Sequence, residues 1–240
     1  MPELVANFTV SPVPYCQCMV TDEQVTAVVD YAKQTLPPVK EWKIPAGYPA
    51  SLGMCVLDSI WSMGVNYNRH VEPVLHRYCE LRSSTVGQVT DTPAVLARTI
   101  ENCGGPDAFA AAVGSRHRTS TKNGILKAEA VHQAATGLAA AKVETSQDLA
   151  RASDAVKTSW LAIRGQRSGV SWRYFQMLAG VEGVKPDRMI HRFITCATGD
   201  RVDNLEAVER LSRAQRRLPA PRPTLTQFDH AIWRYQSGRR

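Results

Sequence analysis

WLAIRGQRSGVSWRYFQMLAGVEGVKPDRMIHRF, residues 160–193, is the most informative segment of this sequence. Its apolar residues predict one helix that ends near Ile163 and a second helix that begins at Val170. Gly165 and Gly169 frame the short connection between the two, and glycine adopts backbone conformations that other residues avoid. The segment therefore predicts two helices joined by a tight turn.

The predicted turn has the features of a phosphate-binding site. Backbone N–H groups at the start of a helix lack intrahelical partners and bind anions, phosphate above all, while Arg164 and Arg167 add positive charge. Such a site contacts the DNA backbone and ignores base identity. The residues expected to form it are Gly165, Gln166, Arg167, Ser168, Gly169 and Ser171. Taken alone, the same residues also fit an ordinary turn between two helices.

The rest of the chain shows helical periodicity as well. Apolar residues recur at helical spacing over residues 22–36, 51–63 and 124–141, and prolines or glycines separate such segments. We find no segment with the alternation of a strand and no internal repeat. A chain of 240 residues with 44% hydrophobic residues is large enough to bury a core. We therefore predict an all-α protein of about ten short helices.

Charge and cysteine content narrow the possible partners. The chain has 29 Lys and Arg residues against 22 Asp and Glu, and this net charge of +7 favours a polyanionic partner. Eight arginines and a single acid, Asp229, lie in residues 210–240, a composition shared by solvated basic tails.

The six cysteines, with Cys16 and Cys18 as an isolated C-x-C, fit no paired zinc pattern, so we expect neither a metal nor a cofactor. No membrane span and no signal peptide are evident, which predicts a cytoplasmic protein.

Beyond the turn, residues 160–193 resemble the helix-hairpin-helix DNA glycosylase superfamily, which contains endonuclease III and the adenine and alkylpurine glycosylases. In that family the hairpin is followed by a helix, a short loop and a catalytic aspartate. Ile163, Gly165, Gly169 and Ser171 occupy hairpin positions here, and Pro186, Asp187 and Arg192 match the later motif. Gly169 lies 18 residues before Asp187, the separation at which lysine-bearing members carry their catalytic lysine.

The resemblance implies a two-lobed helical fold and a monomeric enzyme that acts on double-stranded DNA, associated with the nucleoid. Asp187 would stabilise the cation-like sugar and activate water as the N-glycosidic bond breaks. Asp187 also precedes a predicted helix, where aspartate is a favoured N-cap. Gly169 offers no lysine for Schiff-base chemistry, and Arg167 replaces the second hairpin glycine. Only Cys196 follows Asp187, so no iron–sulfur cluster is expected.

The resemblance extends upstream, over residues 50–200. Residues 52–67 are similar to the early family helix whose end enters the duplex, and residues 124–141 to a family helix that opens with K-A. The candidates for the wedge or base pocket are Trp61, Ser62, Asn66 and Tyr67, and the further candidates for DNA contacts are Lys127 and Arg192. A core tryptophan, a capping turn and a solvated lysine are the ordinary explanations of the same residues.

We expect residues 1–50 to form an arm and a helix, residues 51–200 the glycosylase-like core with its hairpin at 160–180, and residues 201–240 Arg-rich helices that pack back on it. The predicted function is a monofunctional DNA glycosylase that removes a modified, damaged or mismatched base and leaves an abasic site. A non-catalytic DNA-binding protein of the same fold, or a nuclease with the same hairpin, fits the sequence too. DNA repair and defence against modified foreign DNA are both compatible with this activity.

Overall fold

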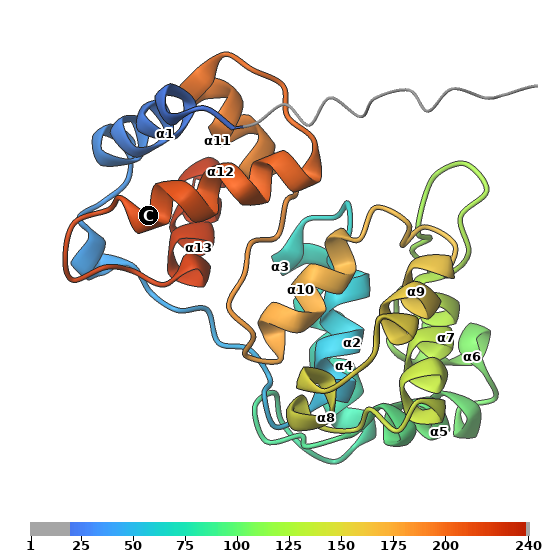
Figure 1. The fold of residues 1–240 in the computed structure, drawn as a ribbon. Helices are drawn as coiled ribbons and strands as arrows, with labels where there is room; N and C mark the ends of the chain where they lie inside the picture. The colour runs from blue at the N-terminus through green and yellow to red at the C-terminus, as the bar shows by residue number, and fades with distance from the viewer. Residues whose placement is uncertain (1–19, 239–240) are drawn as a thin grey trace, which may run out of the picture.

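The computed structural model describes residues 20–238, which fold into helices joined by loops (Figure 1). Within this range there is no strand, only an isolated antiparallel bridge between Arg118 and Leu126. The prediction of an all-α protein is confirmed for this part of the chain. None of its helices combines the length and the apolar character needed to cross a bilayer. Residues 1–19, with the Cys16 and Cys18 pair, lie outside the described residues.

The helices begin where capping residues and prolines stand in the sequence. Thr21 and Ser51 each accept a hydrogen bond from the backbone N–H three residues later, which starts the first two α-helices. Residues 67–81 form two helices that meet at Val71, because Pro73 lacks an N–H and cannot continue the preceding helix. In chain order the helices are α1 (Asp22–Thr35), the 3-10 turn η1 (Val39–Glu41), α2 (Leu52–Trp61), α3 (Tyr67–His70), α4 (Glu72–Leu81), α5 (Pro93–Asn102), α6 (Pro106–Ala112), α7 (Lys127–Ala140), α8 (Ser146–Ala150), α9 (Asp154–Ala162), α10 (Val170–Leu178), α11 (Arg188–Thr198), α12 (Asn204–Arg216) and α13 (Leu225–Gln236).

The helices form two lobes, each with its own hydrophobic core (Figure 1). The central lobe consists of α2 to α10. The terminal lobe combines α1, α11, α12 and α13, so that it is drawn in blue and red from the two ends of the chain. Residues 42–51 and residues 179–187 cross from one lobe to the other. We call the second of these the crossing segment.

Helix α2 is the centre of the central lobe. All of its residues, Leu52–Trp61, are buried, as expected for a helix that is apolar on every face. Helices α5, α7 and α10 pack against it. On the other side of α10, Trp172 and Phe175 pack against Trp160 of α9. The helix that follows the hairpin is therefore fixed between α2 and α9.

Arginine side chains help to hold the terminal lobe together. Arg210 is buried and forms ion pairs with two acids of the same lobe. Arg213 of α12 and Arg217, directly after this helix, both lie 2.5 Å from Asp22 at the start of α1. Helix α13 supplies apolar side chains to the terminal core. Residues 204–236 therefore contribute two helices to the folded terminal lobe, and the alternative of a solvated basic tail does not describe them.

The two cores divide the chain differently from the predicted ranges. The sequence predicted a boundary at residue 200, with α11 in the central part. Instead Ile190, Phe193 and Ile194 of α11 lie in the terminal core, because the apolar face of α11 packs against α1 and α13. The boundary falls in the crossing segment, between Ala179 of the central core and Val184 of the terminal core. Asp187 therefore lies on the terminal side of the boundary, close enough to the central lobe to interact electrostatically with Tyr174.

Candidate active site between the two lobes

Lys185 of the crossing segment contacts both lobes. Its backbone N–H donates to Asp229 Oδ1 of α13 at 2.9 Å. Its Nζ lies 3.2 Å from Ser62 Oγ, directly after α2, and 3.6 Å from the centroid of the Tyr174 ring on α10. An ammonium over an aromatic face is attracted by the ring quadrupole. The junction therefore has a lysine at its centre and side chains from both lobes around it.

The ionisable groups around Lys185 influence one another. Burial lowers the pKa of Lys185, and the carboxylates of Asp187, Asp58 and Asp229 oppose this shift. Burial raises the pKa of Asp229 to about 8; the hydrogen bond from Lys185 lowers it and the charge of Asp187 raises it further. Burial therefore disfavours the ionised form of Asp229. Perturbed groups gathered at a junction of this kind are characteristic of active sites.

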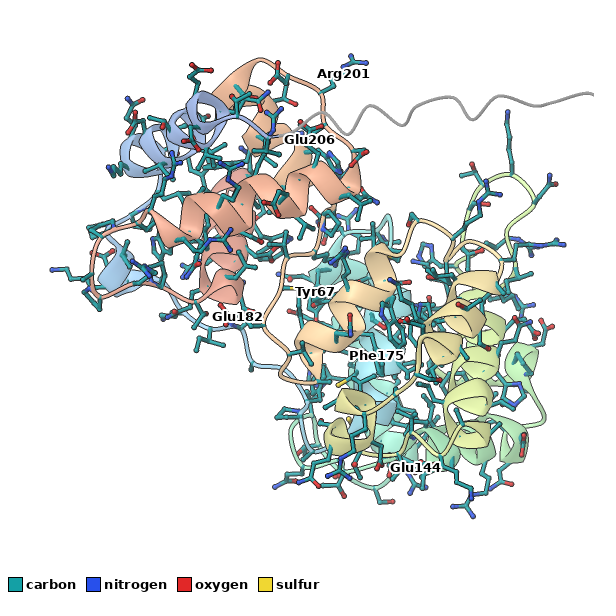
Figure 2. The ribbon with its side chains drawn as sticks, viewed as in Figure 1. Tyr67, Glu144, Phe175, Glu182, Arg201 and Glu206 are labelled. Atoms are coloured by element: carbon teal, nitrogen blue, oxygen red, sulfur yellow. The ribbon has the colours of Figure 1, made fainter. Side chains whose placement is uncertain are left out.

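Asp58 is a buried carboxylate close to Lys185. Its Oδ2 accepts hydrogen bonds from the hydroxyl groups of Tyr67 at 2.7 Å and Tyr48 at 3.2 Å. Its Oδ1 is buried and has no hydrogen-bond partner among the described residues. Burial raises the pKa of Asp58 to about 6, although Tyr67, Lys185 and Tyr48 stabilise the ionised form. Tyr67 lies where the two lobes meet (Figure 2), so this network borders the junction.

Asp187 caps α11 and keeps one carboxylate oxygen available. Its Oδ1 accepts the backbone N–H groups of Met189 at 2.8 Å and Ile190 at 3.4 Å. Its Oδ2 has no hydrogen-bond partner within residues 20–238. The residue is partly exposed, and its charge raises the pKa of Tyr174 and of Asp229. Both roles expected of Asp187 are sterically compatible, since one oxygen serves the helix and the other remains free.

The predicted tight turn lies between α9 and α10. Gly165 and Gly169 have φ values of +92° and +74°, in the left-handed region that favours glycine. Gly165 also leaves no room for a side chain, since a Cβ there would lie 2.5 Å from Thr119 Cβ. The N–H groups of Arg167 and Ser168 donate to no backbone acceptor within the described range, and both residues are exposed. The turn therefore presents free backbone donors and an arginine to solvent.

Hydrogen bonds connect this turn to the first turns of α11. Asn204, at the start of α12, donates from Nδ2 to Ser168 O at 3.2 Å. Its Oδ1 lies 2.9 Å from His191 Nε2. His191 follows Asp187 by four residues, so the two side chains lie on one side of α11. The hairpin is therefore linked through Asn204 to His191, one turn of α11 after Asp187, and the histidine binds Asn204 rather than Asp187.

A protein-family model matches most of the chain. The family described as Domain of unknown function (DUF8548) matches residues 26–237. The chain belongs to this family. The match spans both lobes, the hairpin and the crossing segment, so the junction lies inside the family domain. No curated protein and no solved structure matches the chain.

Lys127 does not point outward as a DNA contact should. It is 1% exposed, and its Nζ donates to Trp61 O and Met63 O, each at 2.6 Å. It thereby satisfies carbonyl groups at the C-terminal end of α2, and burial lowers its pKa to about 8. The predicted phosphate contact at this residue is wrong, because a buried lysine in this position serves the end of another helix.

Two hairpin side chains are also internal. Trp160 Nε1 donates to Ser171 Oγ at 3.0 Å, and Ser171 donates to Gln166 Oε1 at 2.5 Å. Gln166 and Ser171 are each 2% exposed. Their side chains stabilise the hairpin from inside and do not face a ligand. Arg167 and Ser168, together with Arg192 on α11, are exposed and stay predictions as DNA contacts.

The wedge and pocket candidates separate into two groups. Trp61 is buried, donates from Nε1 to Ser115 Oγ at 3.0 Å and packs against Phe109, so it is a core residue and the wedge prediction is wrong for it. Ser62 and Tyr67 border the junction through their contacts with Lys185 and Asp58. Asn66 is exposed and accepts the N–H of Arg69 as the cap of α3.

Sequence reasoning missed Asp58, Lys185, Asp229 and Tyr48. A signal existed for the first of them, because Asp58 is the only ionisable carboxylate within the apolar segment LGMCVLDSIW. Such a residue in a buried helix needs partners, which marks a polar site. The other three come together only through the packing of distant segments. Within residues 20–238, no three His, Cys, Asp or Glu side chains are arranged to hold a metal ion.

Proposed function

We propose that this protein is a monofunctional DNA glycosylase that hydrolyses the N-glycosidic bond of a modified, damaged or mismatched base. The observation that carries the proposal is the link from Ser168 of the hairpin through Asn204 to His191, on the side of α11 that bears Asp187. A phosphate held at the hairpin would bring the sugar of an extruded nucleotide towards the junction. A carboxylate with a free oxygen at that point is what the reaction needs.

The proposed reaction proceeds through a cation-like sugar. The electron pair of the bond between C1′ and the base nitrogen leaves with the base, and positive charge develops at C1′. The free oxygen of Asp187 stabilises this charge and accepts a proton from the attacking water. The water oxygen forms the new bond to C1′, and the proton passes through solvent to the departing base. The product is an abasic site in an intact strand.

Residues around Lys185 would surround the extruded base. The partly exposed rings of Tyr67 and Tyr174 offer apolar surface for a planar base, and Lys185 and Ser62 offer polar contacts. Lys185 also supports the negative charge of Asp187, since the two lie two residues apart and interact electrostatically. With no lysine at position 169, water remains the attacking group in this proposal.

Asp187→Asn tests the proposal sharply, because asparagine caps helices about as well as aspartate but has no charge. The full chain would be incubated with duplexes that carry different modified or mismatched bases, followed by alkali to cleave abasic sites. We expect the variant to lose at least about a hundredfold in product formation while its Tm and DNA affinity stay close to wild type.

Asp203→Asn is the matched control. Asp203 caps α12 with the same geometry, accepting the N–H groups of Leu205 and Glu206 at 2.8 Å, but it is exposed. The Asp203→Asn variant should retain full activity. If no duplex yields abasic sites with the wild-type chain, or if both variants lose activity equally, the glycosylase proposal fails and a non-catalytic DNA-binding protein becomes the better explanation.

A further inference from the structure

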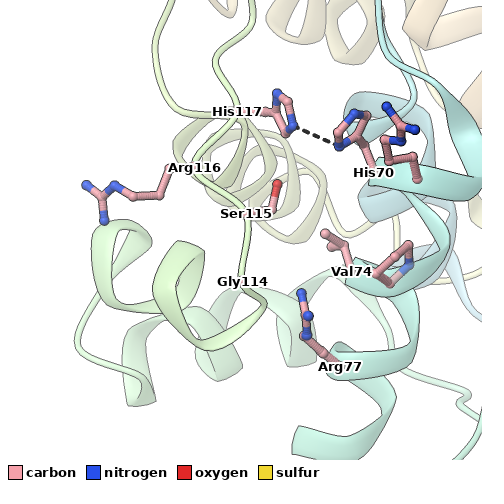
Figure 3. A pocket seen from close by; sticks show the side chains of 9 residues that line it. His70, Val74, Arg77, Gly114, Ser115, Arg116 and His117 are labelled. Carbon is pink, nitrogen blue, oxygen red and sulfur yellow. Dashed lines mark hydrogen bonds between the residues drawn. The ribbon is translucent and has the colours of Figure 1, made fainter.

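A second concave site opens on the central lobe (Figure 3). A cavity of about 280 Å³ lies between α3, α4 and the loop that follows α6. Its cationic lining residues are Arg69, Arg77 and Arg116, with His70 and His117, and no acidic side chain of the described residues lines it. Arg116 is turned away towards Asp107, with which it forms an ion pair. Two arginines and two histidines therefore remain to face the cavity without a counter-charge in its described wall.

Gly114 gives Arg77 its place in this wall. Arg77 Nη1 donates to Val113 O at 3.0 Å. A Cβ at Gly114 would lie 2.3 Å from the same Nη1, and the φ of Gly114 is +63°. A side chain at position 114 would thus displace the guanidinium. Since a guanidinium has five N–H donors in a fixed fork, donors of Arg77 remain for a ligand after the bond to Val113.

The two histidines of the cavity lining contact each other. His117 Nε2 and His70 Nδ1 are 3.2 Å apart, the contact drawn as a dashed line in Figure 3. One ring nitrogen donates to the other in this contact, and the tautomers of the two rings decide which one is the donor. Burial, His70 and Lys127 lower the pKa of His117. An anion in the cavity would oppose this effect by stabilising the protonated form of His117.

We propose that this cavity binds a phosphate group. The planar fork of arginine matches phosphate geometry, and protonated imidazole and the Ser115 hydroxyl add donors. The volume lies near the lower end of small-ligand pockets, roughly 300 Å³, which suits a phosphate group rather than a whole dinucleotide. The group can belong to a DNA backbone or to a small phosphorylated molecule, and both sources share this chemistry.

The loop beside the cavity leads directly to the hairpin. Its residues 118–124 return on themselves, with Arg118 Nε donating to Gly124 O at 2.9 Å. On the hairpin side, Arg164 Nη1 lies 3.4 Å from Asn123 O, and Gly165 packs against Thr119. The cavity and the exposed hairpin turn are therefore joined through one basic loop. The phosphate proposal does not depend on glycosylase activity, because binding requires no chemical step.

Inorganic phosphate is the first probe. The full chain would be titrated with sodium phosphate at constant ionic strength while the imidazole signals of His70 and His117 are followed by NMR. We expect saturable shifts and a raised pKa of His117 when phosphate is bound. Arg77→Met should weaken binding about tenfold or more, and Gly114→Ala should do so without removing a charge. Arg98→Met, an exposed arginine of α5 outside the cavity, should leave binding unchanged.

Duplex DNA of unmodified sequence is the second probe and identifies the source of the phosphate. If the backbone supplies it, Arg77→Met lowers the slope of log affinity against log salt by about one, and Arg98→Met does not. If the slope is unchanged while inorganic phosphate binding is lost, the cavity serves a small phosphorylated molecule. The proposal is overturned if neither probe distinguishes the two arginine variants. Loss of base removal plays no part in either readout, so the two proposals fail independently.

Discussion

Replacing Asp58 with asparagine should change the pH dependence of stability by an amount that follows from its burial. The pKa of Asp58 rises from its ordinary value of 3.8 to about 6 in the folded protein, mainly through burial. A difference of one in pKa corresponds to about 1.36 kcal/mol, so ionising Asp58 costs the folded state about 3 kcal/mol more than it costs the unfolded chain. Between pH 3.8 and 6 the folded state holds more protons, so this group lowers the free energy of unfolding as the pH rises.

The Asp58→Asn substitution would remove that dependence and add a constant cost. The amide oxygen can accept the two tyrosine hydroxyls, but the amide N–H groups would replace the partnerless Oδ1 and cost about 1–3 kcal/mol at every pH. The variant should be less stable than wild type near pH 4. As the pH rises to 6–7, the free energy of unfolding of the wild type should fall by about 3 kcal/mol relative to that of the variant. Above that range the difference between the two free energies should stay constant.

Urea unfolding of both proteins at half-unit steps from pH 4 to pH 8 measures this difference directly. Asp30→Asn, at an exposed residue of α1, is the control and should give a small difference with little pH dependence. A difference between Asp58→Asn and wild type that stays constant over the whole range would refute the reasoning. In that case the carboxyl would titrate alike in both states, and burial would not be perturbing it.

Two further predictions follow from buried contacts. Lys127→Met should lower the free energy of unfolding by about 2 kcal/mol or more, because Trp61 O and Met63 O lose their donor; Lys157→Met, at an exposed residue of α9, is the control in the same urea assay. Gly165→Ala should lower the free energy of unfolding by about 1–3 kcal/mol, since φ is +92° and Thr119 occupies the space of the new Cβ. The same substitution should weaken DNA binding on all sequences alike. Unchanged affinity in that variant would remove the hairpin from the proposed DNA contact.

The elements predicted from sequence were those fixed by local chemistry. Apolar residues at helical spacing, and glycines such as Gly165 and Gly169, act within a few residues of themselves, so their pattern predicted the helices and the tight turn. The grouping of helices into lobes depends on which apolar faces meet, and the sequence does not contain that information in any local form. For this reason α11 was assigned to the wrong side of the boundary.

The candidate site shows the same division between local and long-range information. Asp187 was predicted because its spacing from the hairpin is short-range and matches a known pattern. Lys185 and Asp229 were missed because they lie 44 residues apart and meet only when α13 packs beside the crossing segment. Lys127 was predicted to be an exposed DNA contact because a lysine at a helix start normally faces water. Lys127 is buried because its Nζ donates to the carbonyl oxygen of Met63, 64 residues earlier in the chain and just after α2.

The C-terminal end of α2 is the element on which both proposed sites depend. Trp61 binds Ser115 in the wall of the phosphate cavity, and the next residue, Ser62, binds Lys185 at the lobe junction. Lys127 satisfies the carbonyl groups at this end from inside the protein, so water is not required there. Lys127 therefore holds Trp61 and Met63 in place through two hydrogen bonds. The proposed phosphate cavity and the lobe junction therefore meet at two adjacent residues, Trp61 and Ser62, at the end of α2.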